Sequence, residues 1–393
     1  MAAESLRVDQ ASVRPPAIAD RCAEEFVRTF GVLPTLRSWA PGRINLVGGH
    51  TDVNGGLALP AAINRWVSVC IRPREDDRFV VHALDLGETF EANLAQIPED
   101  STGWRRQITG LVTLIDAQQG LPSGFDAVFT GDVPRGSGLS SSAAMSVAWL
   151  MALNSWTGSN LDKYTLARLS QQVEQDFLGL PCGLLDPIAS LFSEPGCVLE
   201  VDFRDLRVRS IESDFSGLSW VILHSGVSRE LAHSGYADRV RDCAQGLVAL
   251  HRGYPIRHFR DIELDMLDMD TTWAKRLRHV VQENARVQEA SALLQSGQTR
   301  LLGGLLDASH DSLRDLYEVS CAELDHLVEL GSAHPAQLGG RMMGGGFGGC
   351  TLHLVEADRA ESFIGDILAD YRERFHGPSQ GFVLQIEAGA RTD

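Results

Sequence analysis

The segment that most constrains the fold is GDVPRGSGLSSSAAMSVAWL, residues 131–150, where a glycine–serine loop leads directly into an apolar helix. Glycine lets such a loop approach a ligand closely, because no Cβ stands in the way. The start of a helix offers unpaired N–H groups and the positive end of the helix dipole, which suits a phosphate group. The loop lacks the G-K-[ST] ending of a Walker A loop. By itself it also fits a solvated loop with serine caps.

Strands and helices alternate around this loop. Alternating, valine-rich stretches predict strands, and apolar residues at helical spacing predict helices. Asp162 is the expected N-cap of the helix that begins there. The expected strands are 65–73, 78–86 and 124–134, and the expected helices are 18–31, 162–177 and 274–294. Residues 35–49 begin like a strand that Pro41 and Gly42 break. The mixture predicts an α/β fold.

The length of 393 residues exceeds what one hydrophobic core usually supports, so two domains are expected. A change from strand-rich to helix-rich sequence predicts a division into residues 1–218 and 219–393.

Charge and cysteine usage narrow the function classes. The net charge of −17 disfavours nucleic acid or an anionic membrane as a partner. The polar N-terminus lacks an apolar signal core, and no apolar run reaches membrane-spanning length. Seven scattered cysteines without a C-x-x-C pair indicate reduced thiols rather than a zinc site. These features predict a cytoplasmic protein that is a monomer or a weak homo-oligomer.

A second polar, glycine-rich stretch is GRINLVGGHTDVNGG, residues 42–56. Arg43 could neutralise phosphate charge, and Asn45, His50 and Asp52 could hydrogen-bond hydroxyl groups. The structural alternatives are a salt bridge for Arg43, a satisfied turn histidine for His50 and an Asx-turn for Asp52.

Two further segments carry candidate chemistry. In VEQDFLGLPCGLLDPIAS, residues 173–190, Asp186 has apolar neighbours and must find a partner or shift its pKa. Glu174 could hold a metal ion; an exposed helix charge for Glu174 and a helix cap for Asp186 are the alternatives. The segment GGRMMGGGFGGCTLHLV, residues 339–355, allows close approach to a ligand or a loop, or forms a mobile turn.

Taken together and in their order along the chain, these segments resemble the GHMP family of small-molecule kinases, and most closely the galactokinases. PGRINLVGGHTDVNGG resembles the galactokinase signature, GSGLSSSAA the phosphate loop and GGRMMGGGFGGC the third motif of the family. LPCGLLDPIAS is similar to the segment with the catalytic aspartate, and SHDSLRDLYEVSCAELDHLV and ENARVQEASALL are also galactokinase-like. The resemblance covers roughly residues 20–390.

The resemblance implies a two-domain GHMP kinase fold, with an N-terminal domain like ribosomal S5 domain 2 and a ferredoxin-like C-terminal domain. It implies ATP and Mg²⁺ as ligands and phosphoryl transfer to the anomeric hydroxyl of a sugar. Arg43 and Asp186 would be catalytic, with Asp186 either receiving the proton or orienting the hydroxyl, and both should face one cleft. Ser142 (or Ser141) and Glu174 would hold the metal ion. The sugar-binding positions would be His50, Asp52, Gly183 and Tyr236. The ATP-binding positions would be Gly136, Ser137, Gly138, Leu139, Ser140, Ser141, Ser142 and Ala143.

The sequence departs from galactokinases at two positions. Galactokinases typically carry glutamate where this chain has Gly49, and tyrosine where it has Val53. That glutamate is associated with the C6 hydroxyl of the sugar, and a site that loses the partner of a hydroxyl discriminates less for it. With glycine at position 49, galactose, galacturonate and L-arabinose all remain candidate substrates. The expected role is in galactose metabolism.

A non-catalytic sensor that binds sugar and ATP is an alternative of another class. In such galactokinase-like proteins, residues of the Ser-Ala part of the phosphate loop are missing. Ser142 and Ala143 are present here, together with Arg43 and Asp186, and they favour an enzyme. The 309–328 segment and the HTD triplet argue against a mevalonate or homoserine kinase.

Overall fold

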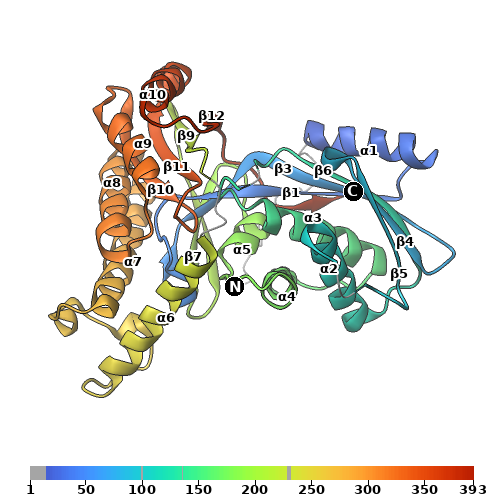
Figure 1. The fold of residues 1–393 in the computed structure, drawn as a ribbon, viewed down its shortest axis with the longest axis horizontal. Coiled ribbons are helices and arrows are strands. Elements are labelled where there is room, and N and C mark those ends of the chain that lie inside the picture. Colours follow the sequence, from blue (N-terminus) through green and yellow to red (C-terminus); the bar gives the residue numbers. More distant parts are fainter. Residues whose placement is uncertain (1–14, 99–100, 135, 228–231) are drawn as a thin grey trace, which may run out of the picture.

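The computed structural model describes residues 15–98, 101–134, 136–227 and 232–393. It is a mixed α/β structure, which confirms the predicted fold class. Figure 1 shows an elongated molecule, with one half built on strands β1 and β3–β6 and the other on helices α6–α10 with strands β9–β12. None of the helices in the described part of the chain combines the length and the apolar character that a bilayer crossing requires.

A six-stranded sheet forms the first half, with the strand order β13-β1-β3-β6-β4-β5. Its strands are β1 (Leu36–Asn45), β3 (Pro60–Pro73), β4 (Arg78–Ala83), β5 (Glu88–Asn93), β6 (Phe125–Gly131) and β13 (Arg391–Thr392). Neighbouring strands are antiparallel, except that β4 and β6 are parallel.

Helices cover both faces of this sheet (Figure 1). They are α1 (Ala17–Phe30), α2 (Gly103–Gln119), α3 (Ser141–Thr157), α4 (Lys163–Gln172) and α5 (Leu185–Phe192). Helix α1 packs on β3 and β6, whereas α3 packs on β1 and β3 from the other face. Helix α3 is apolar around most of its surface and includes the fully buried Trp149. A helix buried in this way holds its N-terminus, and the loop before it, in a fixed place.

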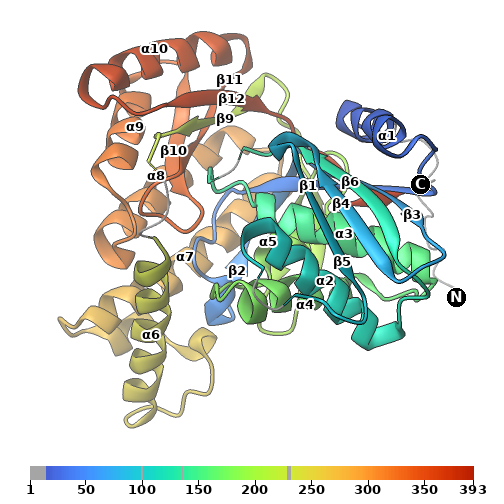
Figure 2. The ribbon, with the colours of Figure 1, turned by 45° about the vertical axis from the view of Figure 1, so that its right-hand side comes forward.

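A four-stranded antiparallel sheet forms the second half, with the order β10-β11-β9-β12. Its strands are β9 (Leu218–His224), β10 (Gln337–Met343), β11 (Cys350–Glu356) and β12 (Gln380–Leu384). The helices of this half are α6 (Ala232–His251), α7 (Thr272–Gln295), α8 (Leu302–Ser312), α9 (Ala322–Ala333) and α10 (Ala360–Arg374). Helices α8 and α9 pack on β10, and α10 packs on β9 and β12 (Figure 2).

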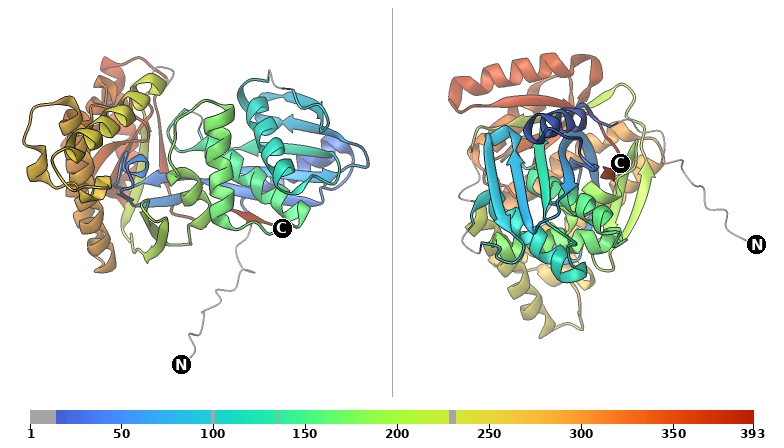
Figure 3. Two further views of the ribbon diagram at one scale, coloured as in Figure 1. Left: turned by 90° about the horizontal axis from the view of Figure 1, so that it is seen from below. Right: turned by 90° about the vertical axis from the view of Figure 1, so that its right-hand side faces the viewer.

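The two halves are connected at several places. A small sheet of β2 (Leu57–Ala58), β7 (Cys197–Asp202) and β8 (Arg207–Glu212) lies against α7. Strand β13 returns from the end of the chain to pair with β1, so the C-terminus lies beside the first sheet (Figure 3). One apolar cluster contains residues from both halves, including Val147, Val287 and Leu352. Strand β9 begins at Leu218, and a division into domains at this residue stays a prediction.

Three local predictions need correction. The strand expected over 78–86 ends at Ala83, and Leu84–Leu86 form a 3-10 turn. Strand β1 continues through Pro41 and Gly42, because a shift of register against β3 between Pro41 and Arg43 absorbs the irregularity as a bulge. The helix expected over 162–177 is α-helical only to Gln172 and then forms a π-helical turn, Val173–Phe177. The predicted N-cap is confirmed, because Asp162 accepts a hydrogen bond from the Thr165 backbone at 2.8 Å.

Candidate functional site

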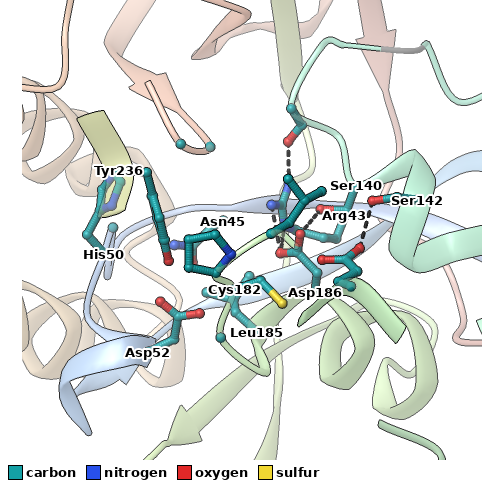
Figure 4. A pocket seen from close by; sticks show the side chains of 18 of the residues that line it. Arg43, Asn45, His50, Asp52, Ser140, Ser142, Cys182, Leu185, Asp186 and Tyr236 are labelled. Atoms are coloured by element: carbon teal, nitrogen blue, oxygen red, sulfur yellow. Dashed lines mark hydrogen bonds and ion pairs between the residues drawn. The ribbon is translucent and has the colours of Figure 1, made fainter. Parts of the chain in front are cut away.

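A cavity of about 310 Å³ lies where the glycine–serine loop, the end of β1 and the glycine-rich turn after β10 come together. Its wall contains Arg43, Asn45, Gly49, His50, Asp52, Gly136, Gly138, Ser140, Ser141, Ser142, Glu174, Leu180, Pro181, Cys182, Gly183, Leu185, Asp186, Tyr236, Arg341, Gly344 and Gly345. Figure 4 shows Arg43, Ser140 and Asp186 toward one side of the cavity and His50 and Tyr236 toward the other. After the ligands expected from the sequence, we call these sides the phosphate end and the sugar end.

Arg43 and Asp186 meet at the phosphate end, although 143 positions separate them in sequence. Nε and Nη2 of Arg43 both lie 2.7 Å from Oδ1 of Asp186, and Nη1 donates to the Gly138 carbonyl. Ser140 donates its hydroxyl to Oδ2 of Asp186. Asp186 stands in the first turn of α5 and is partly exposed to the cavity, whereas Arg43 is buried. Both carboxylate oxygens are therefore held in place by residues of other segments.

The glycine–serine loop is shaped by its glycines and by close contact with β1. Gly136 and Gly138 have φ of 69° and 83°, in the region that favours glycine. A Cβ on Gly42 would lie 2.7 Å from the Leu139 carbonyl, which also accepts the Arg43 N–H at 3.1 Å. This contact brings the loop onto the strand that carries Arg43, so that the start of α3 faces the cavity.

Ser142 and Glu174 form the second polar pair of this end, with the serine hydroxyl 2.8 Å from Oε1 of the carboxylate. Glu174 lies on the π-helical turn, a feature often found at functional sites. Burial and the nearby Asp186 raise its pKa above the usual range. No cluster of three or more His, Cys, Asp or Glu side chains suited to a metal occurs within the described residues. Two oxygen ligands nevertheless fit Mg²⁺, which usually keeps several waters and takes its other ligands from a substrate phosphate.

His50 and Tyr236 line the sugar end, with ring centroids 5.5 Å apart. The imidazole also lies 4.7 Å from the Tyr317 ring, and burial lowers its pKa to about 3, so the ring is neutral. Within the described residues, Nε2 of His50 and Oδ1 of Asn45 are buried without a hydrogen-bond partner. Such atoms are costly unless a ligand or water satisfies them. Both residues line the cavity, so a polar ligand would satisfy these atoms if the two side chains turned toward it.

Asp52 packs directly against Gly183. A Cβ on Gly183 would lie 1.8 Å from Oδ2 of Asp52, so only glycine fits this arrangement. Burial raises the pKa of Asp52 to about 6, and the charge of Asp186 adds to the effect. The two residues expected to bind sugar thus form one surface.

Glu283, on α7, holds the loop between β1 and His50 in place. Its Oε1 accepts hydrogen bonds from the backbone of Gly48 at 2.9 Å, Gly49 at 3.1 Å and the Ser309 hydroxyl at 2.6 Å. Burial alone would raise the pKa of Glu283, but Arg286 and the other neighbouring charges hold it below the usual range. On the same helix, Nε2 of His279 lies 3.0 Å from the Gly49 carbonyl.

The structure therefore brings most of the sequence-predicted site residues to one cavity. Three loop positions differ in that their side chains turn into the protein: Ser137, Leu139 and Ala143. These three residues would therefore contact a nucleotide through their backbone groups only. Sequence reasoning missed Glu283 and Arg341. The only sequence signal for Arg341 is a charged residue inside a strand of apolar and glycine neighbours.

Comparison with known proteins identifies the family. Residues 24–73 match the galactokinase galactose-binding signature, 107–194 the GHMP kinases N terminal domain, and 290–372 the GHMP kinases C terminal family. A galactokinase of Roseiflexus sp. is 37% identical over 372 residues, which cover 93% of this chain and 95% of the relative. The chain belongs to the galactokinase family. It is thus a sugar kinase of the GHMP group.

Other relatives agree with this assignment. The galactokinase of Homo sapiens is 37% identical, with 97% of this chain and 99% of the human protein covered. The crystal structure of Lactococcus lactis galactokinase complexed with galactose superposes with a TM-score of 0.88 and 32% identity, covering 94% of this chain and 98% of that one. The mevalonate kinase of Methanococcus jannaschii, at 18% identity and a TM-score of 0.66, shares the fold.

Proposed function

We propose that this sugar kinase transfers the γ-phosphoryl group of ATP to the anomeric C1 hydroxyl of galactose or a close galactose-type sugar, giving sugar 1-phosphate and ADP. The contact between Arg43 and Asp186, beside the loop that opens α3, carries the proposal. The printed names of the relatives, and the galactose in the Lactococcus lactis complex, support the substrate class.

The phosphate end would hold ATP. Phosphoryl transfer requires positioning and charge neutralisation more than covalent work by the protein. The loop from Gly136 to Ala143 would bind the phosphates through backbone N–H groups and serine hydroxyls. Mg²⁺, held by Ser142 and Glu174, would supply positive charge to the phosphate oxygens.

Arg43 and Asp186 would act at the reacting hydroxyl. The C1 oxygen forms a bond to the γ-phosphorus as the bond from that phosphorus to the β–γ bridging oxygen breaks, and ADP leaves with the electron pair. Asp186 receives the hydroxyl proton or orients the hydroxyl. Arg43 stabilises charge on the phosphoryl group in transfer.

The other end would bind the sugar. His50, Asp52, Tyr236 and the Gly183 backbone present donors and acceptors that suit several hydroxyl groups. The neutral imidazole of His50 leaves one ring nitrogen for a hydroxyl, and Asn45 adds an acceptor.

Gly49 favours a second candidate, a galactose-type sugar altered at C6, such as galacturonate or L-arabinose. This glycine lies on the cavity wall, where it contributes no side chain that could bond a C6 hydroxyl. A site without that partner gives up much of its discrimination for the hydroxyl.

A sugar panel tests the proposal. The purified chain with ATP and Mg²⁺ should release ADP with galactose, galacturonate or L-arabinose, and phosphorus NMR should show the new phosphate on C1. Saturable sugar binding without ADP release would contradict the proposal and support a sensor. Cytoplasmic location, a monomeric or weakly associating state, and the absence of nucleic-acid and membrane partners belong to the same proposal.

A further inference from the structure

The guanidinium of Arg341 lies at the cavity wall with one nitrogen unused. Within the described residues, Nε donates to the Met342 carbonyl at 2.9 Å, and Nη1 donates to the Leu46 carbonyl at 3.0 Å and lies 3.5 Å from Glu283. Nη2 makes none of these contacts. The side chain is 2% exposed, and Arg341 is one of the cavity-lining residues. The free N–H groups of Nη2 therefore need a partner from the cavity.

Gly49 is what allows the guanidinium to reach this place. A Cβ at position 49 would lie 2.6 Å from Nη2 of Arg341, closer than such atoms can approach. The backbone itself does not demand glycine, because Gly49 is not among the positive-φ residues. The absence of a side chain at position 49 thus opens the cavity to Arg341.

The charges around this corner are unbalanced. Two guanidiniums, the buried one of Arg341 and the partly buried one of Arg286, face the single carboxylate of Glu283. The neighbouring His50 and His279 are neutral, because burial lowers their pKa to about 3 and about 4. Elsewhere the cavity wall carries three carboxylates, those of Asp52, Glu174 and Asp186. Away from the phosphate end, where Arg43 and the start of α3 would meet the ATP phosphates, the cavity therefore favours an anionic ligand group in the corner of Gly49 and Arg341.

We propose that Arg341 is a specificity-determining residue that binds the carboxylate of a sugar acid, and that the preferred substrate class is a galactose-type hexuronic acid. This inference rests on the proposed function and makes its substrate more specific. The position of the carboxyl group follows from the reaction. An aldonic acid has no anomeric hydroxyl to phosphorylate, whereas a uronic acid, oxidised at C6, keeps it.

The first test uses the unmodified protein. Initial rates with galacturonate, its neutral methyl ester, galactose and L-arabinose are compared at fixed ATP and Mg²⁺. We expect kcat/KM for galacturonate to exceed that for the ester and for galactose by on the order of 10- to 100-fold, the usual range for a charged hydrogen bond in a protein site. A higher value for galactose, the ester or L-arabinose would overturn this inference and leave the kinase proposal standing. Turnover of none of the four would instead overturn the kinase proposal.

Two matched variants test the role of charge. Gly49→Glu and Gly49→Gln place side chains of equal size beside Arg341, and both force the guanidinium to move by a similar amount. Only the glutamate neutralises it and repels a sugar carboxylate. We expect the ratio of galacturonate to galactose kcat/KM to fall at least tenfold further in Gly49→Glu than in Gly49→Gln, mainly through KM. Equal ratios in the two variants would contradict a charge-based role for Arg341.

Discussion

The two ends of the cavity differ in how far their polar groups satisfy one another. At the phosphate end, Arg43, Ser140 and Ser142 each contact a carboxylate already. At the sugar end, Nε2 of His50 and Oδ1 of Asn45 are buried without a partner in the described structure. An unsatisfied buried polar group costs about 1–3 kcal/mol. The sugar end should therefore gain more from its ligand for each contact, whereas the phosphate end must exchange internal bonds for new ones.

The largest expected effect concerns the carboxylate of the phosphate end. Asp186→Asn keeps the shape of the side chain but cannot take up a proton, so kcat/KM should fall by on the order of 10²–10⁴-fold. Steady-state ADP release measures the change. Ser140→Ala is the control, because it removes one hydrogen bond to Asp186 and keeps the carboxylate. An equal loss of kcat in both variants at saturating ATP would show that orientation, rather than the charge of Asp186, carries the rate.

Removing the charge of Glu283, which holds the loop of the sugar end, should lower the free energy of unfolding. Glu283→Gln removes the carboxylate between Arg286 and Arg341, and breaking a buried ion pair costs about 3–5 kcal/mol. Urea denaturation should show a correspondingly lower free energy of unfolding. Glu289→Gln, at an exposed position of the same helix, should stay within about 0.5 kcal/mol of the wild type. A matching result for both variants would mean that Glu283 does not hold the loop.

The smallest expected effect is a pH dependence at Asp52. Its pKa of about 6 in the folded protein exceeds the ordinary value of 3.8, so its contribution to stability is complete at low pH and is lost as the pH rises through 6. Asp52→Asn should remove this loss. Relative to the wild type, the variant should gain about 1–3 kcal/mol of unfolding free energy between pH 4 and pH 7.5. Parallel stability curves for the two proteins would contradict a raised pKa at this position.

Sequence reasoning worked best where one continuous segment contains the chemistry. The loop from Gly136 to Ser142 joins its glycines, hydroxyls and helix start within a few residues, and the fold class followed from strand and helix periodicity. The meeting of Arg43 and Asp186 was expected only through the family resemblance, because no local pattern links residues so far apart.

The sugar end could not be derived in the same way. Gly49 lies in a loop after β1, and Arg341 lies in a strand far along the chain. Only the packing shows that the guanidinium of Arg341 fills the space that a side chain at position 49 would take. Glu283 looks like an ordinary helix-face charge in sequence, yet it is fully buried and bonded to the backbone of the loop. The bulge in β1 was missed because Pro41 and Gly42 usually end a strand, whereas here the register shift retains the pairing.

The return of β13 to the edge of β1 has a consequence for biosynthesis. Arg37 and Asp393 exchange backbone hydrogen bonds of 2.9 Å in both directions, and their side chains form an ion pair. The strand that carries Arg43 emerges early from the ribosome, but its outer edge gains these bonds only after residues 391–393 have been synthesised. During translation that edge is open to pairing with other nascent chains, so chaperone protection is most valuable until residues 391–393 have emerged and paired with it.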